Sequence, residues 1–126
     1  MPSDPRTADV STSDHARPLT VLQLVPTMKS GGVERGAIEI AQALIDRGDR
    51  ALIASRGGRM VAQFRRIGGE FHELDMATKS PIVMYRNVAR LRTLIREEGV
   101  DIVHARSRAP AWSGYYAARA EGVPFV

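Results

Sequence analysis

One stretch of the chain, residues 19–40, constrains the fold more than any other. It opens with the continuous apolar run LTVLQLV, which is typical of a buried parallel strand, and Pro26 ends that run. Two adjacent glycines follow, and apolar residues then recur at helical spacing from Val33 to Ile45. This pattern predicts a helix with one face packed on a sheet, and Gly48 is placed to end it.

The same unit of strand, turn and helix recurs along the rest of the chain. Serine and proline at positions 80 and 81 predict the start of a second long helix, and Gly99 predicts its end. Strands that alternate with helices form right-handed crossovers, so we expect an α/β fold: a Rossmann-like, mainly parallel sheet with helices on both faces. Further strands are expected over residues 50–55, 70–74, 100–105 and from 124, and further helices over 60–67 and after 107.

The chain divides into a short leader and one domain. Residues 1–18 are rich in Pro, Ser, Thr and Asp and contain little to bury, so we expect a disordered leader. Residues 19–126 are enough for one domain with a real core, but few for a two-domain enzyme. We therefore expect a single Rossmann-like domain over 19–126 that is incomplete.

Composition excludes several classes of function. The chain has no cysteine, and its three histidines show no metal-ligand spacing, so we predict neither thiolate chemistry nor a metal site. The 18 cations outnumber the 14 acids, and all but Lys29 and Lys79 are arginine. Arginine suits phosphate and anionic surfaces, although a genome-wide codon bias gives the same ratio. The arginines are not interleaved with aromatic residues, so we expect no nucleic-acid partner.

Hydropathy gives an expectation for location. No apolar run approaches the ~20 residues that span a bilayer, and no basic segment leads into an apolar one at the N-terminus. We expect a cytoplasmic protein. A weak attraction to anionic lipid stays open, which would make the protein peripheral at the inner face of the membrane.

The glycine turn is the first candidate site. A helix that begins after a parallel strand presents free N–H groups and a positive dipole end, which favour an anion at Gly31, Gly32 and Val33. The spacing is not that of a P-loop, because Ala37 and Ile38 follow Gly36 where Lys and Ser or Thr are required. A nicotinamide dinucleotide fingerprint is also absent. The alternative is that the glycines only form a tight turn.

The segment HARSRAP is the second candidate site. It lies at the carboxyl end of the strand expected over 100–105, where ligands bind in open α/β sheets, which places His104, Arg106 and Ser107 in a functional position. Two structural alternatives stay open. His104 can be a buried imidazole with one hydrogen bond, and Ser107 can cap the following helix.

The order of these motifs resembles the N-terminal domain of family 4 glycosyltransferases, which have the GT-B fold. The resemblance rests on the first strand, GGVERG, a helix ended by glycine, then DIVHARSRAP and GVPFV, and it covers residues 19–126. It implies a retaining transfer of sugar from a nucleotide-diphosphate sugar to a hydroxyl acceptor, in glycan, lipopolysaccharide or glycolipid synthesis, without a cofactor. It assigns Gly31 and Gly32 to the diphosphate site and makes His104 an acceptor-side candidate.

The resemblance also implies what this stretch lacks. The histidine usually discussed as catalytic follows the strand that begins at Val123, so we expect no catalytic residue within these 126 residues. A second domain would supply the main donor contacts, and this chain by itself would be inactive. The alternative is a non-catalytic Rossmann-like module that binds a nucleotide or a partner protein. Two glutamates eight positions apart in a further domain would favour the enzyme.

Overall fold

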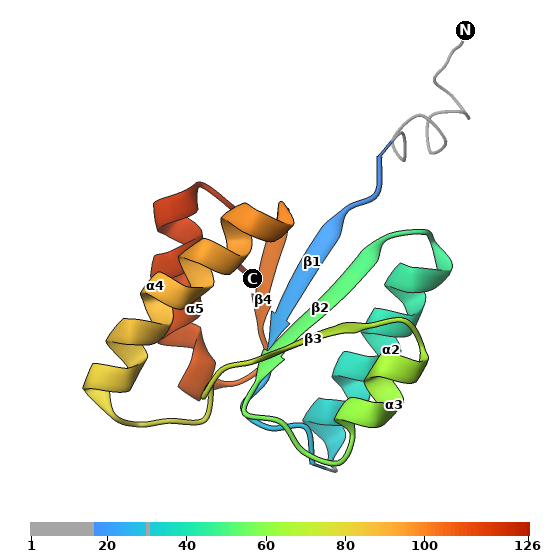
Figure 1. The fold of residues 1–126 in the computed structure, drawn as a ribbon, viewed down its shortest axis with the longest axis horizontal. Helices are drawn as coiled ribbons and strands as arrows, with labels where there is room; N and C mark the ends of the chain where they lie inside the picture. The colour runs from blue at the N-terminus through green and yellow to red at the C-terminus, as the bar shows by residue number, and fades with distance from the viewer. Residues whose placement is uncertain (1–16, 30) are drawn as a thin grey trace, which may run out of the picture.

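A computed structural model describes residues 17–29 and 31–126 of the chain. Within these ranges, four parallel strands form one sheet in the order β3-β2-β1-β4, with helices on both faces (Figure 1). The elements in chain order are β1 (Thr20–Leu24), α2 (Gly32–Asp46), β2 (Arg50–Ser55), α3 (Val61–Arg66), β3 (Glu70–Glu73), α4 (Pro81–Glu98), β4 (Ile102–Ala105) and α5 (Arg108–Glu121). The predicted Rossmann-like α/β fold is confirmed. The leader expected over residues 1–18 lies outside the described residues except for its last two.

Side chains that alternate along the strands fill two cores. Leu22 and Leu24 of β1 face α4 and α5, whereas Val25 and the β2 residues Ala51 and Ile53 belong to the core under α2 and α3. All five residues of β1 are buried, because this strand lies inside the sheet and both its faces are covered. The continuous apolar run predicted this position correctly.

The expected helix boundaries are also confirmed. The Ser80 hydroxyl accepts a hydrogen bond from the Val83 N–H at 3.4 Å, and Pro81 is the first residue of α4. Gly99 ends α4 in the left-handed region with φ of 63°, and Gly48 follows α2 with φ of 88°. An L side chain is disfavoured at both angles, so glycine fixes both stops.

One expectation about α2 is wrong. The apolar spacing placed Val33 on the packed face of the helix, but its side chain is 42% exposed and burial on this helix begins at Ala37. The first turn of α2 extends beyond the carboxyl edge of the sheet, so no strand covers it (Figure 1). Val33 is therefore available to solvent at this edge.

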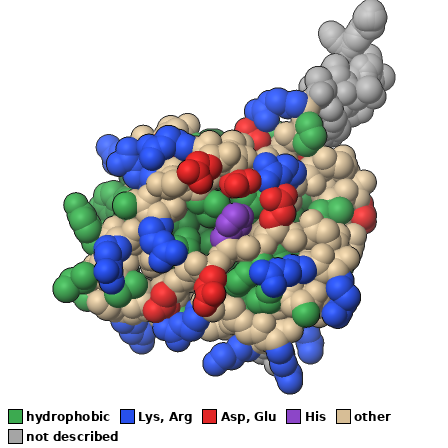
Figure 2. Space-filling view, viewed as in Figure 1, with side chains coloured by type: hydrophobic (Ala, Val, Ile, Leu, Met, Phe, Trp, Pro, Cys, Tyr) green, Lys and Arg blue, Asp and Glu red, His purple; other side chains and the backbone are tan. Residues whose placement is uncertain are grey.

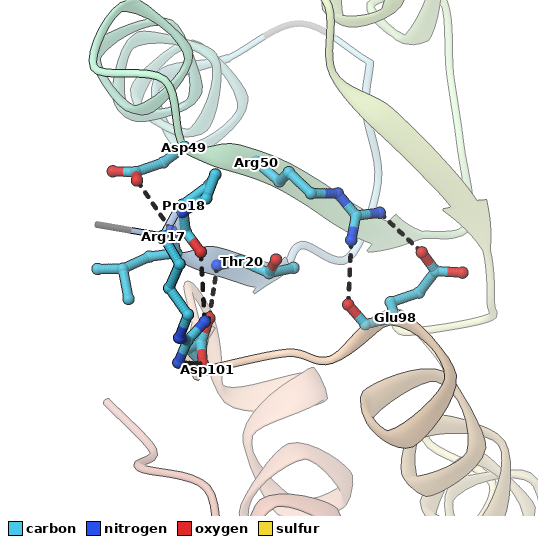
Figure 3. A network of polar contacts seen from close by, with 8 residues as sticks. Arg17, Pro18, Thr20, Asp49, Arg50, Glu98 and Asp101 are labelled. Carbon is cyan, nitrogen blue, oxygen red and sulfur yellow. Dashed lines mark hydrogen bonds and ion pairs between the residues drawn. The ribbon is translucent and has the colours of Figure 1, made fainter. Parts of the chain in front are cut away.

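Charged side chains cross-link the opposite, amino edge of the sheet (Figure 3). The Arg50 guanidinium pairs with Glu98 at the end of α4 at 2.7 Å, as Figure 3 shows. It also pairs with Glu70 of β3 at 2.6 Å. These hydrogen bonds to Arg50 hold the pKa of the Glu70 carboxyl below its usual value. Asp101 accepts a hydrogen bond from the Thr20 N–H at 2.8 Å, which joins the start of β4 to β1. The amino edge is thus tied together by polar contacts between distant segments.

The last residues align with β4, as expected for the start of a fifth strand. Val103 and Phe125 form a parallel bridge, and the Val126 N–H donates to the Val103 carbonyl at 2.9 Å. None of the helices in the described ranges is long and apolar enough to cross a membrane.

Candidate functional site

The strand order creates a switch point between β1 and β4. From β1 the chain moves outward through β2 to β3, and it then returns to place β4 on the other side of β1 (Figure 1). The loops after β1 and β4 therefore diverge at the carboxyl edge. Crevices at such switch points hold the ligands of open α/β sheets, so the two candidate segments lie where a site is expected.

The start of α2 has free backbone donors. Gly31 is the N-cap and its carbonyl accepts the first helical hydrogen bond from the Arg35 N–H at 3.0 Å, but no side chain caps the helix. The N–H groups of Gly32, Val33 and Glu34 precede that first helical bond, and the positive end of the helix dipole adds to them. This arrangement suits an anion.

The backbone weakens the alternative that the glycines only form a tight turn. Gly31 is extended, with φ of 164° and ψ of 178°, and Gly32 is in the helix, so neither adopts the left-handed region. A Cβ at Gly32 would meet no atom within 4 Å, and one at Gly31 would meet only the flexible Glu34 carboxylate at 2.9 Å. Other residues could form this turn. What glycine supplies here is an open surface beside the helix end.

A glycine after β2 supports this loop, and the sequence alone did not indicate it. Gly58 has φ of 156°, and a Cβ there would lie 2.5 Å from the carbonyl carbon of Met28. The close approach allows the Met28 N–H to donate to the Gly57 carbonyl at 3.0 Å and the Met60 N–H to donate to the Met28 carbonyl at 2.7 Å. The loop after β1 is therefore held against the loop after β2.

A carboxylate already lies near the start of α2. The Thr27 hydroxyl donates to Glu34 Oε2 at 3.1 Å, and Glu34 Oε1 is the atom nearest to a Cβ at Gly31. Its negative charge is favourable at the positive end of the helix. A bound anion would share this end with the Glu34 side chain.

His104 is half-buried on the α2 side of the sheet. It pairs in register with Gln23 of β1, whose amide nitrogen donates to the Ala37 carbonyl of α2 at 3.0 Å. Burial, followed by the positive charge of Arg106, lowers the pKa of His104, so the imidazole is neutral at pH 7. Its ring makes no hydrogen bond with the described residues. The structure therefore differs from the alternative in which His104 is a buried imidazole with one hydrogen bond.

Arg106 lies across the first turns of α2. Its Nη1 is 3.5 Å from Gln23 Oε1, and its buried Nε has no acceptor among the described residues. A Cβ at Gly36 would lie 2.7 Å from Nη2 of Arg106, so glycine at position 36 makes room for the guanidinium. Sequence reasoning missed this role and used Gly36 only to exclude a P-loop. The available signal was the third glycine of GGVERG, inside a helix where glycine is unfavourable.

Ser107 occupies the N-cap position of α5, as the alternative proposed, but its hydroxyl makes no capping hydrogen bond. It is exposed and extended, with φ of −165°. The structure therefore brings Arg106 and two helix starts without a side-chain cap, those of α2 and α5, to the same edge. His104 lies two residues before Arg106 along the chain, so its side chain is on the same face of the sheet as that of Arg106.

These features define a Rossmann-like domain with an anion-suited site at the switch point of its sheet. A comparison with models of protein families matches residues 30–126 to Glycosyltransferase Family 4. The chain belongs to this family, and its fold is that of the N-terminal domains of GT-B glycosyltransferases.

Solved structures with the same fold include several glycosyltransferases. A glycosyltransferase from Rickettsia africae ESF-5 is 41% identical, with a TM-score of 0.78 over 86% of this chain and 28% of that one. Acinetobacter baumannii MurG is 18% identical, with a TM-score of 0.70 over 86% of this chain and 34% of that one. Anabaena Alr3699/HepE, solved with UDP and glucose, is 20% identical, with a TM-score of 0.67 over 85% of this chain and 28% of that one.

The last two likenesses show the fold alone, because their identity is low. The chain spans about a third or less of the length of all three proteins. A search of curated proteins finds no match.

Proposed function

We propose that this chain is the acceptor-side domain of a retaining glycosyltransferase. The donor is a nucleotide-diphosphate sugar and the acceptor is a hydroxyl of a sugar or glycolipid, in the cytoplasm. The observation that carries the proposal is the open, uncapped start of α2 beside Arg106, at the switch point of a domain of this family. The 41% identity to the Rickettsia africae glycosyltransferase supports the class of enzyme, and HepE, which shares the fold, was solved with UDP and glucose.

The proposed roles follow from charge and position. Cleavage of the donor leaves negative charge on the diphosphate, and the N–H groups of Gly32 and Val33 can take up part of that charge. The Arg106 guanidinium adds a fixed positive charge at the same edge. His104 is neutral, so it can both donate and accept a hydrogen bond from a sugar hydroxyl. The main donor contacts belong to a second domain, and the isolated chain is inactive.

Gly32→Val tests the anion site. Valine adds bulk where the wild type has open space, so the helix should form while the ligand is kept from its N–H groups. We expect turnover to fall by at least about a hundredfold, the typical loss when one donor to a developing charge is removed. The matched control is Ala62→Val, which places the same branched side chain at the exposed start of α3.

The assay compares UDP-, GDP- and ADP-sugars with residues 1–126 and with a form extended to the natural stop codon. Turnover by the extended form alone is expected. A folded Gly32→Val protein with full activity would refute the role of the glycine turn. Nucleotide binding without turnover by either form would favour a non-catalytic module instead.

A further inference from the structure

Exposed apolar side chains gather where α4 and α5 begin. The two helices lie side by side and both start at the carboxyl edge of the sheet (Figure 1), with the Ser113 hydroxyl donating to the Met84 carbonyl at 2.9 Å. Five of the eight large apolar side chains that are exposed among the described residues lie on these two helices. We call them the aromatic face: Ile82 (71% exposed), Tyr85 (74%), Trp112 (43%), Tyr115 (40%) and Tyr116 (46%).

The three members of the aromatic face on α5 are in contact with one another, and an apolar hollow joins them to α4. Trp112 lies with Pro81 and Met84 around an apolar hollow of about 290 Å³, which joins the two helices. Its ring centroid is 5.0 Å from that of Tyr116, and the Tyr116 centroid is 5.1 Å from that of Tyr115. Contiguous exposed apolar patches mark interaction surfaces, whereas single exposed residues do not.

The surroundings of this face are strongly cationic. Residues 76–96 and 107–120 include no Asp or Glu, and neither α4 nor α5 has an acid in its first turn, where acids are favourable. Figure 2 shows apolar side chains between Lys and Arg side chains over α4. The cations of these two segments are Lys79, Arg86, Arg90, Arg92, Arg96, Arg108 and Arg119.

The acids nearest to this face are already paired. Asp75 lines a hollow with Arg86, but its carboxylate pairs with Arg56 at 2.8 Å. Glu121 pairs with the two arginines on the last turns of α4. Lys79, Arg86 and Arg108 are exposed and pair with no carboxylate in the described part of the chain. Their charge is available to a partner.

We propose that the aromatic face docks on an anionic lipid bilayer. Trp and Tyr carry an apolar ring and a polar tip, which is the combination enriched at the boundary of hydrocarbon and headgroups. Arginines beside them are attracted to anionic headgroups. A nucleic acid fits less well, because the aliphatic Ile82 has no ring on which a base can stack. The spacing of residues along the sequence does not predict this face, because its aromatic residues and arginines come from two helices.

The position of the face fits the site described above. Both lie at the carboxyl edge of the sheet, so docking would hold that edge against the membrane. If the proposed function holds, a lipid-linked acceptor would be presented beside His104 and Arg106. Docking itself does not depend on catalysis, so it can be tested separately.

Sedimentation with lipid vesicles tests the charge requirement. The purified chain should sediment with phosphatidylcholine vesicles that contain about 30% phosphatidylglycerol and not with pure phosphatidylcholine. Each arginine near an anionic surface contributes about fivefold to partitioning, so Arg86→Gln/Arg108→Gln should lose about 25-fold. The matched control, Arg65→Gln/Arg66→Gln, removes the same charge from exposed positions at the end of α3, away from the carboxyl edge, and should lose little.

A second pair of variants tests the apolar requirement. Ile82→Asn/Tyr85→Asn should reduce vesicle binding by about tenfold or more, because both side chains would enter the interface. Ile40→Asn, at an exposed position on α2, is the control. All these side chains are exposed, and circular dichroism melts would verify that each variant folds.

Trp112 provides a direct reading of contact, since it is the only tryptophan in the sequence. Its emission should shift to shorter wavelength on binding and be quenched by brominated lipid. Unchanged emission, an equal loss of binding in the control pair, or no binding to anionic vesicles would overturn the proposal. Duplex DNA binding that needs the arginines but not Ile82 and Tyr85 would show a nucleic-acid surface instead. If the wild-type chain were a dimer and Ile82→Asn/Tyr85→Asn were a monomer, the face would instead be an interface between two copies of the chain.

Discussion

One methyl group at position 36 can remove the contact between Gly36 and Arg106 without damaging the core. The Cβ of Gly36→Ala would lie 2.7 Å from Nη2 of Arg106, so the guanidinium must move. Nη2 ends a flexible side chain, and the hydrogen bond from Nη1 to Gln23 is long at 3.5 Å, so this movement costs little. Alanine is better than glycine inside a helix by about 0.5–1 kcal/mol. We expect the free energy of unfolding to stay unchanged or to rise by up to about 1 kcal/mol.

Gly114→Ala is the control with the opposite expectation. A Cβ at Gly114 would lie 2.4 Å from Leu24 Cδ1 and 3.1 Å from Phe125 Cε1, and Leu24 is fully buried. Either the leucine or α5 must shift, and such overpacking costs about 1–3 kcal/mol, which exceeds the gain in helix propensity. Urea unfolding of both variants measures the difference. If Gly36→Ala were as destabilised as Gly114→Ala, Arg106 would be fixed in place and the reasoning would fail.

The same substitution should weaken ligand binding. In the proposed site, Arg106 donates a charge-assisted hydrogen bond to the diphosphate. Displacing the guanidinium would remove that bond, which is worth about 1.5–3 kcal/mol, or at least about tenfold in affinity. Calorimetric titration of the extended protein with UDP would compare Gly36→Ala, Arg106→Ala and the double variant. We expect the double variant to lose no more than Arg106→Ala alone, because both act on the same group. Additive losses would refute the coupling.

Two further predictions concern stability. Leu91→Ala should lose about 2–5 kcal/mol, since Leu91 is buried against the sheet, whereas exposed Arg92→Ala should stay within roughly 0.5 kcal/mol; equal effects in urea melts would contradict the helix register. The lowered pKa of His104 means that the unfolded state binds its proton more readily, so the free energy of unfolding should fall as the pH drops below about 6.5. In His104→Gln the free energy of unfolding should fall less over this pH range. If it fell equally in the wild type and in His104→Gln between about pH 7.5 and pH 5.5, the pKa of His104 would not be lowered.

Much of the fold could be predicted because local patterns determine it. The apolar run of β1 requires burial on both faces, and Ser80 with Gly99 bounds α4 through local hydrogen bonds and backbone angles. Alternating strands and helices then leave few topologies. Val33 was misplaced because periodicity defines the face of a helix but not where the sheet beneath it ends.

The position of the candidate site in the fold could be predicted from the sequence, but the contacts between its residues could not. The carboxyl ends of β1 and β4 are predictable positions, and the residues there lie at one edge as expected. The fit of Arg106 over Gly36 depends on how closely α2 approaches β4, which no local pattern encodes. The support of Met28 by Gly58 is hidden for the same reason, because it joins two loops that are distant in the sequence.

The ion pairs around Arg50 and Asp101 have a consequence for how this domain can be altered. They fasten the amino edge, while the described loop residues 25–29 and 106–107 extend from the other edge and share none of those bonds. Transplanting both loops together from a relative should therefore exchange ligand preference while the melting behaviour of the recipient is retained. Such a division would let new specificities arise by loop replacement on an unchanged frame.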